Sequence, residues 1–268
     1  MRQLSAEVID RAKKEGRAAL VAYIPVGFPS FEGTVEAVRA LVGSGVDAIE
    51  FGIPYTDPVM DGPVIQEAAD LALAQGTRPV DVMRAIDSLN DLDAALLVMS
   101  YYNPILKYGL EAFARDLAAA GGAGVITPDL TPDSGGEWIA ASRAHGVERI
   151  FLAAPSSPEK RLRLVTKSST GFVYAASTMG VTGLRSSVGE AARTLVERTR
   201  DAGAERVCVG LGVSNGAQAA EVGAYADGVI VGSAFVRRLL EAQTPSERLR
   251  SIEALARELR TGIEEARA

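Results

Sequence analysis

Two acidic residues stand where a protein can use carboxylates for acid–base chemistry. Glu50 lies in the apolar run 46–51, and Asp61 follows eleven residues later. In an extended strand, Glu50 points to the face opposite Ile49 and Phe51, whose side chains are suited to packing under helices. Glu50 is therefore expected to point into the protein interior, where a carboxylate must be paired, protonated or functional. A buried glutamate that a neighbouring hydroxyl or backbone group satisfies is the structural alternative.

The loop after Glu50, residues 52–63, is dense in Pro, Gly and Asp. Proline stiffness lowers the entropy that is lost when such a loop is held over a site. Asp61 lies in this loop, so both carboxylates can face the same pocket. Asp before Pro or Gly is also common in turns, and turn formation is the alternative role for Asp57 and Asp61.

Two glycine clusters follow the last two strand-like runs, at residues 209–212 and 231–233, and each precedes a helical segment. Glycines let backbone N–H groups approach an anion, and a helix N-terminus favours its charge. The clusters therefore predict a phosphate site, with tight turns as the alternative. The loop 177–187 is long, polar and made of small residues. It is either a lid in which Gly183 adds another N–H to the anion, or a flexible surface loop.

Eight strand-like runs alternate with stretches of helical spacing, which predicts parallel strands joined by helical crossovers. The runs are 19–24, 46–51, 95–101, 123–127, 148–153, 171–176, 206–210 and 227–232. Eight such units predict an α/β fold, a (β/α)8 TIM barrel that forms a single domain over residues 1–268. Extra terminal helices over 5–14 and 246–266 are expected to cap or flank it. A doubly wound open sheet is the alternative, because periodicity does not show whether a sheet closes.

Two helix starts carry capping signals: Thr244 with Glu247 forms a capping box, and Ser157 precedes Pro158. In a (β/α)8 barrel the active site lies at the carboxyl end of the strands, and the loops after strands seven and eight recurrently bind phosphate. The carboxylates and both glycine clusters are therefore expected at the same end.

Composition narrows the chemistry. Asp and Glu number 34 against 28 Lys and Arg, a net charge of −6, which argues against a broad nucleic-acid surface. One Cys excludes a disulfide framework, and one His weakens every His-based scheme, so no metal site is expected. No apolar run approaches the length of about 20 residues that spans a bilayer, and the N-terminal segment is too polar for a signal peptide. A cytoplasmic protein is expected.

The segment AIEFGIPYTDPVMDGPVIQ, together with GVTG at 180–183 and the two glycine clusters, resembles the tryptophan synthase α subunit family over essentially the whole chain. The resemblance implies a (β/α)8 barrel that cleaves indole-3-glycerol phosphate to indole and glyceraldehyde 3-phosphate in tryptophan biosynthesis. It implies no cofactor in this chain. It also implies a partner β subunit, which receives the indole and uses pyridoxal phosphate, in a heterotetramer of two α and two β subunits.

The resemblance also implies roles for individual residues. Its catalytic positions are Glu50, Asp61 and Tyr174; its phosphate-binding positions are Gly183, Gly210, Gly212, Gly232 and Ser233; its indole-pocket positions are Tyr23, Met99 and Leu211; and its positions in loops that face the β subunit are Asp57, Asn103 and Pro132. Pro25 stands where the family usually has threonine, and residues 55–56 and 59–60 also depart from its commoner pairs. None of these departures touches the acid pair or the phosphate glycines.

These residues suggest a retro-aldol mechanism. Glu50, partly desolvated, is expected to have a raised pKa and to exchange protons with carbon and hydroxyl. Asp61, in a more polar loop, is expected to stay ionised and to accept a hydrogen bond from the indole N–H. Three alternatives are a free-standing lyase that needs no partner, a non-catalytic regulatory subunit that binds a phosphorylated ligand, and a sugar-phosphate isomerase on the same barrel.

Overall fold

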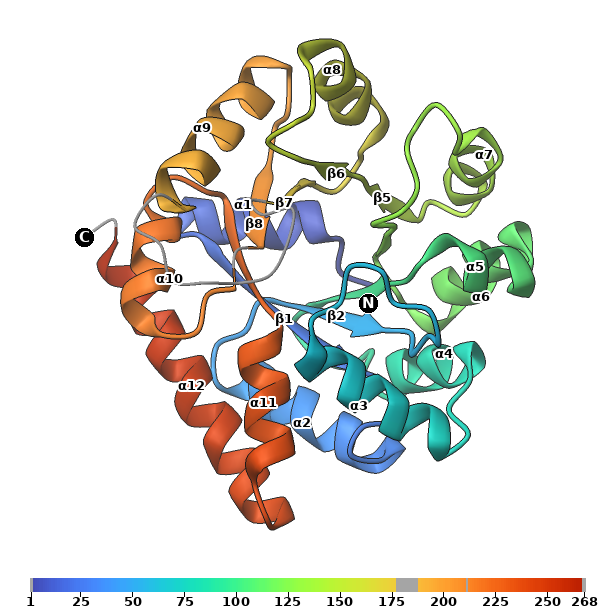
Figure 1. Cartoon of the computed structure of the whole chain (residues 1–268), viewed down its shortest axis with the longest axis vertical. Helices are drawn as coiled ribbons and strands as arrows, with labels where there is room; N and C mark the ends of the chain where they lie inside the picture. The colour runs from blue at the N-terminus through green and yellow to red at the C-terminus, as the bar shows by residue number, and fades with distance from the viewer. Residues whose placement is uncertain (1, 177–187, 211, 267–268) are drawn as a thin grey trace.

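The computed structural model describes residues 2–176, 188–210 and 212–266, and its strands form one parallel sheet (Figure 1). The strands lie in the order β5-β4-β3-β2-β1-β9-β8-β7-β6. They are β1 (Ala19–Pro25), β2 (Ala48–Gly52), β3 (Ala95–Met99), β4 (Gly124–Ile126), β5 (Glu148–Ile150), β6 (Leu152–Ala153), β7 (Val173–Ala176), β8 (Val207–Gly210) and β9 (Gly228–Val231).

The ring of strands closes through the fifth predicted run, which the structure divides at Phe151. The first part, β5, pairs with β4, and the second part, β6, pairs with β7. At the break, the Ser169 hydroxyl accepts the N–H of Phe151 (3.3 Å) in place of a strand partner, while the carbonyl of Phe151 accepts the N–H of Tyr174 (3.1 Å). The two ends of the strand order are thus consecutive in the chain. The predicted (β/α)8 barrel is confirmed, and the open sheet is wrong.

Helices surround the strands on the outside (Figure 1). In the described ranges they are α1 (Ser5–Lys14), α2 (Phe31–Gly43), α3 (Pro63–Ala74), α4 (Pro79–Asp87), α5 (Tyr102–Tyr108), α6 (Leu110–Ala120), α7 (Gly136–Ala144), α8 (Glu159–Ser168), α9 (Val188–Asp201), α10 (Gly216–Gly223), α11 (Ser233–Glu241) and α12 (Pro245–Glu265). No helix in these ranges is both long and apolar enough to cross a membrane.

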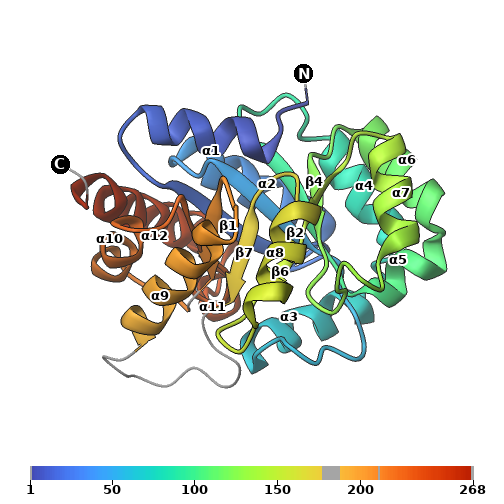
Figure 2. The same ribbon diagram turned by 90° about the horizontal axis from the view of Figure 1, so that it is seen from above.

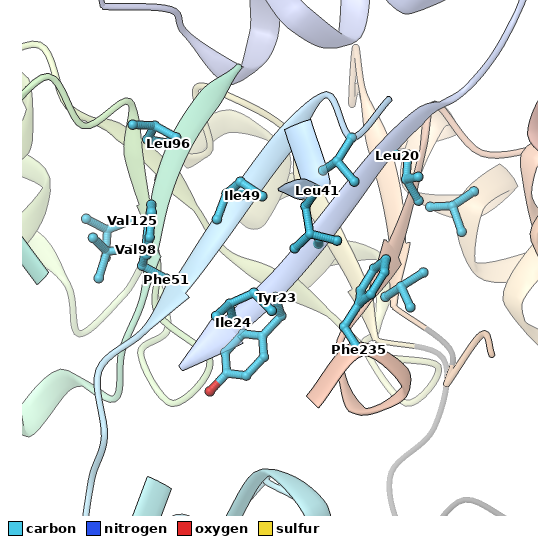
Figure 3. Packing of buried hydrophobic residues seen from close by; sticks show 14 of the residues in the cluster. Leu20, Tyr23, Ile24, Leu41, Ile49, Phe51, Leu96, Val98, Val125 and Phe235 are labelled. Carbon is cyan, nitrogen blue, oxygen red and sulfur yellow. The ribbon is translucent and has the colours of Figure 1, made fainter. Parts of the chain in front are cut away.

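The strands alternate between an outer and an inner core. Outward side chains such as Leu20 and Ile49 pack with Leu41 of α2 and Phe235 of α11 (Figure 3). Inward side chains such as Val21 form a second cluster inside the barrel, which Val8, Ile9 and Ala12 of α1 also join. This alternation is what directs Glu50 of β2 to the inside.

Helix α1 lies across the amino end of the barrel (Figure 2). Glu148, a buried residue of β5, holds it there by accepting the N–H groups of Ser5 (2.8 Å) and Ala6 (3.1 Å) and the Ser5 hydroxyl (2.6 Å). These bonds satisfy amides that the start of a helix leaves without an internal acceptor. The amino end is therefore closed, and the carboxyl end is left for the site.

The predicted capping box of α12 is confirmed. The Thr244 hydroxyl accepts the N–H of Glu247 (3.3 Å), and the Glu247 carboxylate accepts the N–H of Thr244 (3.1 Å). The prediction for Ser157 is wrong by one residue, because α8 begins at Glu159 and Pro158 occupies the capping position. The Ser157 hydroxyl instead accepts the N–H of Ala154 (3.1 Å) within the preceding turn.

Candidate active site

Glu50 is completely buried inside the barrel, in register with Tyr23 on β1 and Leu97 on β3. Neither of its carboxyl oxygens has a hydrogen-bond partner among the described residues. Burial without a compensating partner disfavours the charged form and raises the pKa of Glu50 to about 8. At neutral pH this carboxyl is therefore mostly protonated and able to donate a proton. The alternative of a structurally satisfied glutamate has no support in the described part of the chain.

Asp61 lies in the loop between β2 and α3, where Gly62 precedes the helix that begins at Pro63. Its carbonyl oxygen accepts a hydrogen bond from the Gln66 side chain (2.7 Å), which ties the end of the loop to α3. Its carboxyl group is less solvated than the sequence suggested: burial raises the pKa of Asp61, and a hydrogen bond from Tyr101 opposes that rise. Asp61 thus stands in a partly buried rather than a polar, solvated environment.

Two tyrosines lie over glycines on neighbouring strands in the same way. A methyl group built on Gly52 would come within 2.2 Å of the Tyr23 hydroxyl oxygen, and one built on Gly210 would come within 2.2 Å of the Tyr174 hydroxyl oxygen. In the register of the sheet, each glycine lies two residues beyond the residue that pairs with the tyrosine. The two glycines therefore leave room for tyrosine side chains to reach the carboxyl end, and Figure 3 shows the Tyr23 hydroxyl directed that way.

The tyrosines and the carboxylates form one electrostatic group. Burial is the largest cause that raises the pKa values of Tyr23 and Tyr174, and the charges of Glu50 and Asp61 raise both further. Tyr101 also acts on Tyr23. The structure thus links Glu50, Asp61 and Tyr174 electrostatically, and it places Tyr23, which the resemblance assigns to the indole pocket, in the same group. Met99, the last residue of β3, is partly buried and packs against both cores.

Four of the five predicted phosphate residues lie at the ends of the last two strands. Gly210 ends β8, and Gly212 adopts a φ of +69°, a backbone conformation that favours glycine. Gly232 caps α11, whose first residue is Ser233 and whose first turn presents N–H groups without an internal acceptor. A methyl group built on Gly232 would contact the Cβ of Tyr23 at 3.4 Å, so this cluster adjoins the tyrosine that faces Glu50.

Asn215 caps α10, the helix that follows the first glycine cluster, and its side chain accepts the N–H of Gln218 (3.0 Å). Two of the predicted site residues, Gly183 and Leu211, lie outside the described residues, as does the whole loop 177–187.

The three residues predicted to face a partner differ in exposure. Asp57 and Asn103 are exposed, and the Asn103 amide donates to the Tyr55 hydroxyl (3.1 Å). Pro132 is buried in this chain, while its neighbours Thr131 and Asp133 are exposed. The loop thus exposes the residues that flank Pro132 rather than Pro132 itself.

One residue of the site was missed by sequence reasoning. Tyr101 follows β3, is almost fully buried, and accepts the N–H of Met60 at its hydroxyl (2.8 Å). The same hydroxyl also hydrogen-bonds the side chain of Asp61, which follows Met60 in the loop. The available signal was its position, since an aromatic residue just beyond the carboxyl end of a barrel strand faces the mouth where active sites lie.

Taken together, the fold and the site define a (β/α)8-barrel protein that gathers carboxyl and hydroxyl groups suited to acid–base chemistry at the carboxyl end of its strands. In the described part of the chain, no group of three or more His, Cys, Asp and Glu side chains is arranged to hold a metal ion.

Comparisons with known proteins agree with this class and narrow it. A model of the tryptophan synthase alpha chain family matches residues 9–264. The tryptophan synthase alpha chain of Thermobifida fusca is 57% identical over 259 residues, which cover 95% of this chain and 96% of that protein. The alpha chain of Mycobacteroides abscessus is 53% identical over 260 residues, with 97% of each chain covered. A structure of Mycobacterium tuberculosis tryptophan synthase matches with a TM-score of 0.90 at 48% identity, covering 98% of this chain and 99% of that one.

The chain therefore belongs to the tryptophan synthase alpha chain family. It is an enzyme subunit of the lyase class that cleaves indole-3-glycerol phosphate in tryptophan biosynthesis. Alpha chains of this family function with a β subunit, to which the pyridoxal phosphate belongs.

Proposed function

We propose that Glu50 and Asp61 carry out the retro-aldol cleavage of indole-3-glycerol phosphate, with Glu50 as the acid–base group and Asp61 as the stabilising charge. The observation that carries this proposal is the fully buried Glu50 carboxyl group, which has no hydrogen-bond partner among the described residues and a pKa raised to about 8. A carboxyl group with a pKa close to the working pH serves well as both acid and base.

The proton balance of the reaction suits a single carboxyl group. Glu50 donates its proton to C3 of the indole ring, which places a positive charge on the ring nitrogen. The carboxylate that remains then takes the proton of the adjacent side-chain hydroxyl. As that O–H bond breaks, the new carbonyl forms, the carbon–carbon bond to C3 breaks, and its electron pair neutralises the ring. Glu50 ends protonated, so no net proton is consumed.

Asp61 has a different task in the proposal. Its ionised carboxylate accepts a hydrogen bond from the indole N–H and stabilises the positive charge that develops on the ring. Tyr174 is partly buried, the charges of both carboxylates raise its pKa, and it is proposed to lie beside the reacting centre. Tyr23 and Met99, together with Leu211, are proposed to line the indole pocket.

Phosphate anchoring is assigned to the backbone at the ends of β8 and β9. Gly210, Gly212, Gly232 and Ser233, with Gly183, are proposed to hold the phosphate through N–H groups and the N-terminus of α11. Binding energy from this remote group then orients the reacting bond over Glu50. An acidic chain can bind an anion in this way, because the contacts come from the backbone.

The proposed assembly is a heterotetramer of two α and two β subunits, in which the β subunit receives the indole and carries the pyridoxal phosphate. Asp57, Asn103 and the loop of Pro132 are proposed to face the β subunit, and the exposure of Asp57 and Asn103 supports this. No cofactor is assigned to this chain, which is proposed to act as one domain in the cytoplasm.

The decisive experiment measures indole release from indole-3-glycerol phosphate by the purified chain, with and without a tryptophan synthase β subunit. We expect measurable release by the chain alone and faster release with the β subunit. Equal, high activity in both conditions would identify a free-standing lyase. No release in either condition, with phosphate-ligand binding retained, would identify a regulatory subunit.

We expect Asp61→Asn to reduce the turnover number by about 10²–10³-fold, because the amide cannot supply the negative charge that stabilises the developing cation. The Michaelis constant should change much less, since the phosphate residues are untouched. Steady-state kinetics of indole release measure both quantities. Asp57→Asn is the matched control, because Asp57 is exposed in the same loop, and the isolated chain should keep its turnover. An unchanged rate for Asp61→Asn would remove Asp61 from the chemistry.

A further inference from the structure

We infer that Tyr101 is a positioning residue, whose hydroxyl group holds the Asp61 carboxylate in the geometry that the reaction needs. This inference rests on the proposed function, because it assigns Tyr101 a role that acts through Asp61. Tyr101 follows β3 and Asp61 follows β2, so the contact joins the loops at the carboxyl ends of two neighbouring strands.

The hydroxyl of Tyr101 hydrogen-bonds two consecutive residues of the loop. It accepts the backbone N–H of Met60 at 2.8 Å, and it contacts both the backbone and the carboxylate of Asp61, donating to the carboxylate. The backbone N–H groups can only donate to the Tyr101 oxygen, so its single hydrogen is free to point toward the carboxylate. A single side chain therefore sets both the path of the backbone before Asp61 and the orientation of its carboxylate.

The ring of Tyr101 is itself held. It is almost fully buried, and its centroid lies 5.4 Å from that of Tyr55 at an interplanar angle of 36°. The Tyr55 hydroxyl accepts a hydrogen bond from Asn103 (3.1 Å), so the start of the loop is also tied to the segment that follows β3. The loop is thus bound to this segment at both ends, although Val59 between them has 81% of its surface exposed. An exposed loop needs such ties if it is to present a carboxylate reproducibly.

The titratable groups that interact with Asp61 from the surrounding strands are Tyr101, Tyr23 and Tyr174, and Glu50 acts on the last two of these tyrosines as well. Tyr101 is the one whose hydroxyl is hydrogen-bonded to Asp61, and that bond lowers the pKa of Asp61 against the effect of burial. Loss of this hydroxyl should therefore raise the pKa of Asp61. The acidic limb of activity, where Asp61 becomes protonated, should then move to higher pH.

The test is Tyr101→Phe, which keeps the ring and its packing on Tyr55 and removes only the hydroxyl. We expect kcat to fall by about 10-fold to 100-fold, the loss associated with one hydrogen bond to a charged group, with KM little changed. The acidic limb of kcat/KM should shift upward in pH. Tyr108→Phe is the matched control: its hydroxyl bonds Asp116 (2.8 Å), and that pair lies on α5 and α6 outside the site. This control should keep the wild-type kcat and pH profile.

A double-mutant cycle separates this inference from the proposed function. If Tyr101 acts through Asp61, adding Tyr101→Phe to the Asp61→Asn variant should lower kcat by less than a further twofold. Equal losses in both backgrounds would overturn the inference. Where Asp61→Asn is too slow for the cycle, the pH profile decides: an unmoved acidic limb in Tyr101→Phe overturns it. If Asp61→Asn kept full activity, the proposed role of Asp61 would be wrong, and this inference would be wrong with it. If Tyr101→Phe kept full activity while Asp61→Asn was impaired, only the inference about Tyr101 would be wrong.

Discussion

Glu50→Gln is expected to lower indole release from indole-3-glycerol phosphate by about 10³–10⁴-fold, the upper range for loss of one general acid–base group. The amide matches the carboxyl group in shape, but it can neither give a proton to indole C3 nor take one from the substrate hydroxyl. Because the Glu50 carboxyl group serves both proton transfers in the proposed mechanism, no other side chain in that mechanism replaces its function in the variant. Affinity for glycerol 3-phosphate, measured by calorimetry, should stay nearly unchanged because the glycine clusters remain intact.

The matched control is Glu148→Gln. Glu148 is also a buried glutamate on a barrel strand, but it lies at the opposite end and bonds the first residues of α1. That variant should release indole at close to the wild-type rate under conditions where it is folded. Normal indole release by Glu50→Gln would sink the assignment of Glu50. Equal loss in both variants would point instead to a general effect of altering a buried glutamate.

The inward direction of Glu50 was predictable because the alternation of a strand is a local property. Ile49 and Phe51 mark the outer face, and Glu50 must then point inward. The capping box at Thr244 was predictable for the same reason, since its partners lie three residues apart. For closure of the barrel, the sequence offered only the number of strand–helix units, which was eight. The interruption at Phe151 could not be foreseen, because it depends on the hydroxyl of Ser169, eighteen residues further along the chain.

The surroundings of Asp61 were the part of the site that sequence reasoning described least well. A loop rich in Pro, Gly and Asp suggested a polar, solvated setting, but Tyr101 covers the carboxylate from the next strand. That contact joins residues forty positions apart, and no spacing rule connects them. The place of Tyr23 over Gly52 is similar: β1 and β2 must pair in register before the glycine becomes the gap that the ring fills.

Glu50 is also expected to make the free energy of unfolding depend strongly on pH. The pKa of this carboxyl group rises from 4.5 to about 8 in the folded protein, so the folded state holds a proton that the unfolded state releases over this interval. The free energy of unfolding therefore contains a contribution that is fully present below pH 4.5 and is lost as the pH rises toward about 8. The loss amounts to about 1.4 kcal/mol per pH unit within that window.

Glu50→Gln removes this contribution because the amide does not titrate. We expect the variant to gain stability relative to the wild type as the pH rises, with a total change of about 4–5 kcal/mol across the window. Urea unfolding at a series of pH values, followed by circular dichroism and by fluorescence, measures the difference. Only the pH dependence of this difference in unfolding free energy is diagnostic. A buried amide without hydrogen-bond partners also destabilises the variant by an amount that does not change with pH. Glu50→Leu should show the same pH dependence of the difference in unfolding free energy. Its pH-independent part should be more favourable than that of Glu50→Gln, because leucine buries no polar group.

Glu148→Gln provides the contrast, since its carboxylate is bonded to the N–H groups and hydroxyl at the start of α1. Weakening those charge-assisted hydrogen bonds should destabilise the protein rather than stabilise it at alkaline pH. The two glutamates thus predict opposite signs from one chemical change, according to whether the carboxyl group has partners. If the difference between Glu50→Gln and the wild type were flat with pH, the Glu50 carboxyl would not be desolvated in the folded protein. The proton that the proposed mechanism draws from it at neutral pH would then have no source.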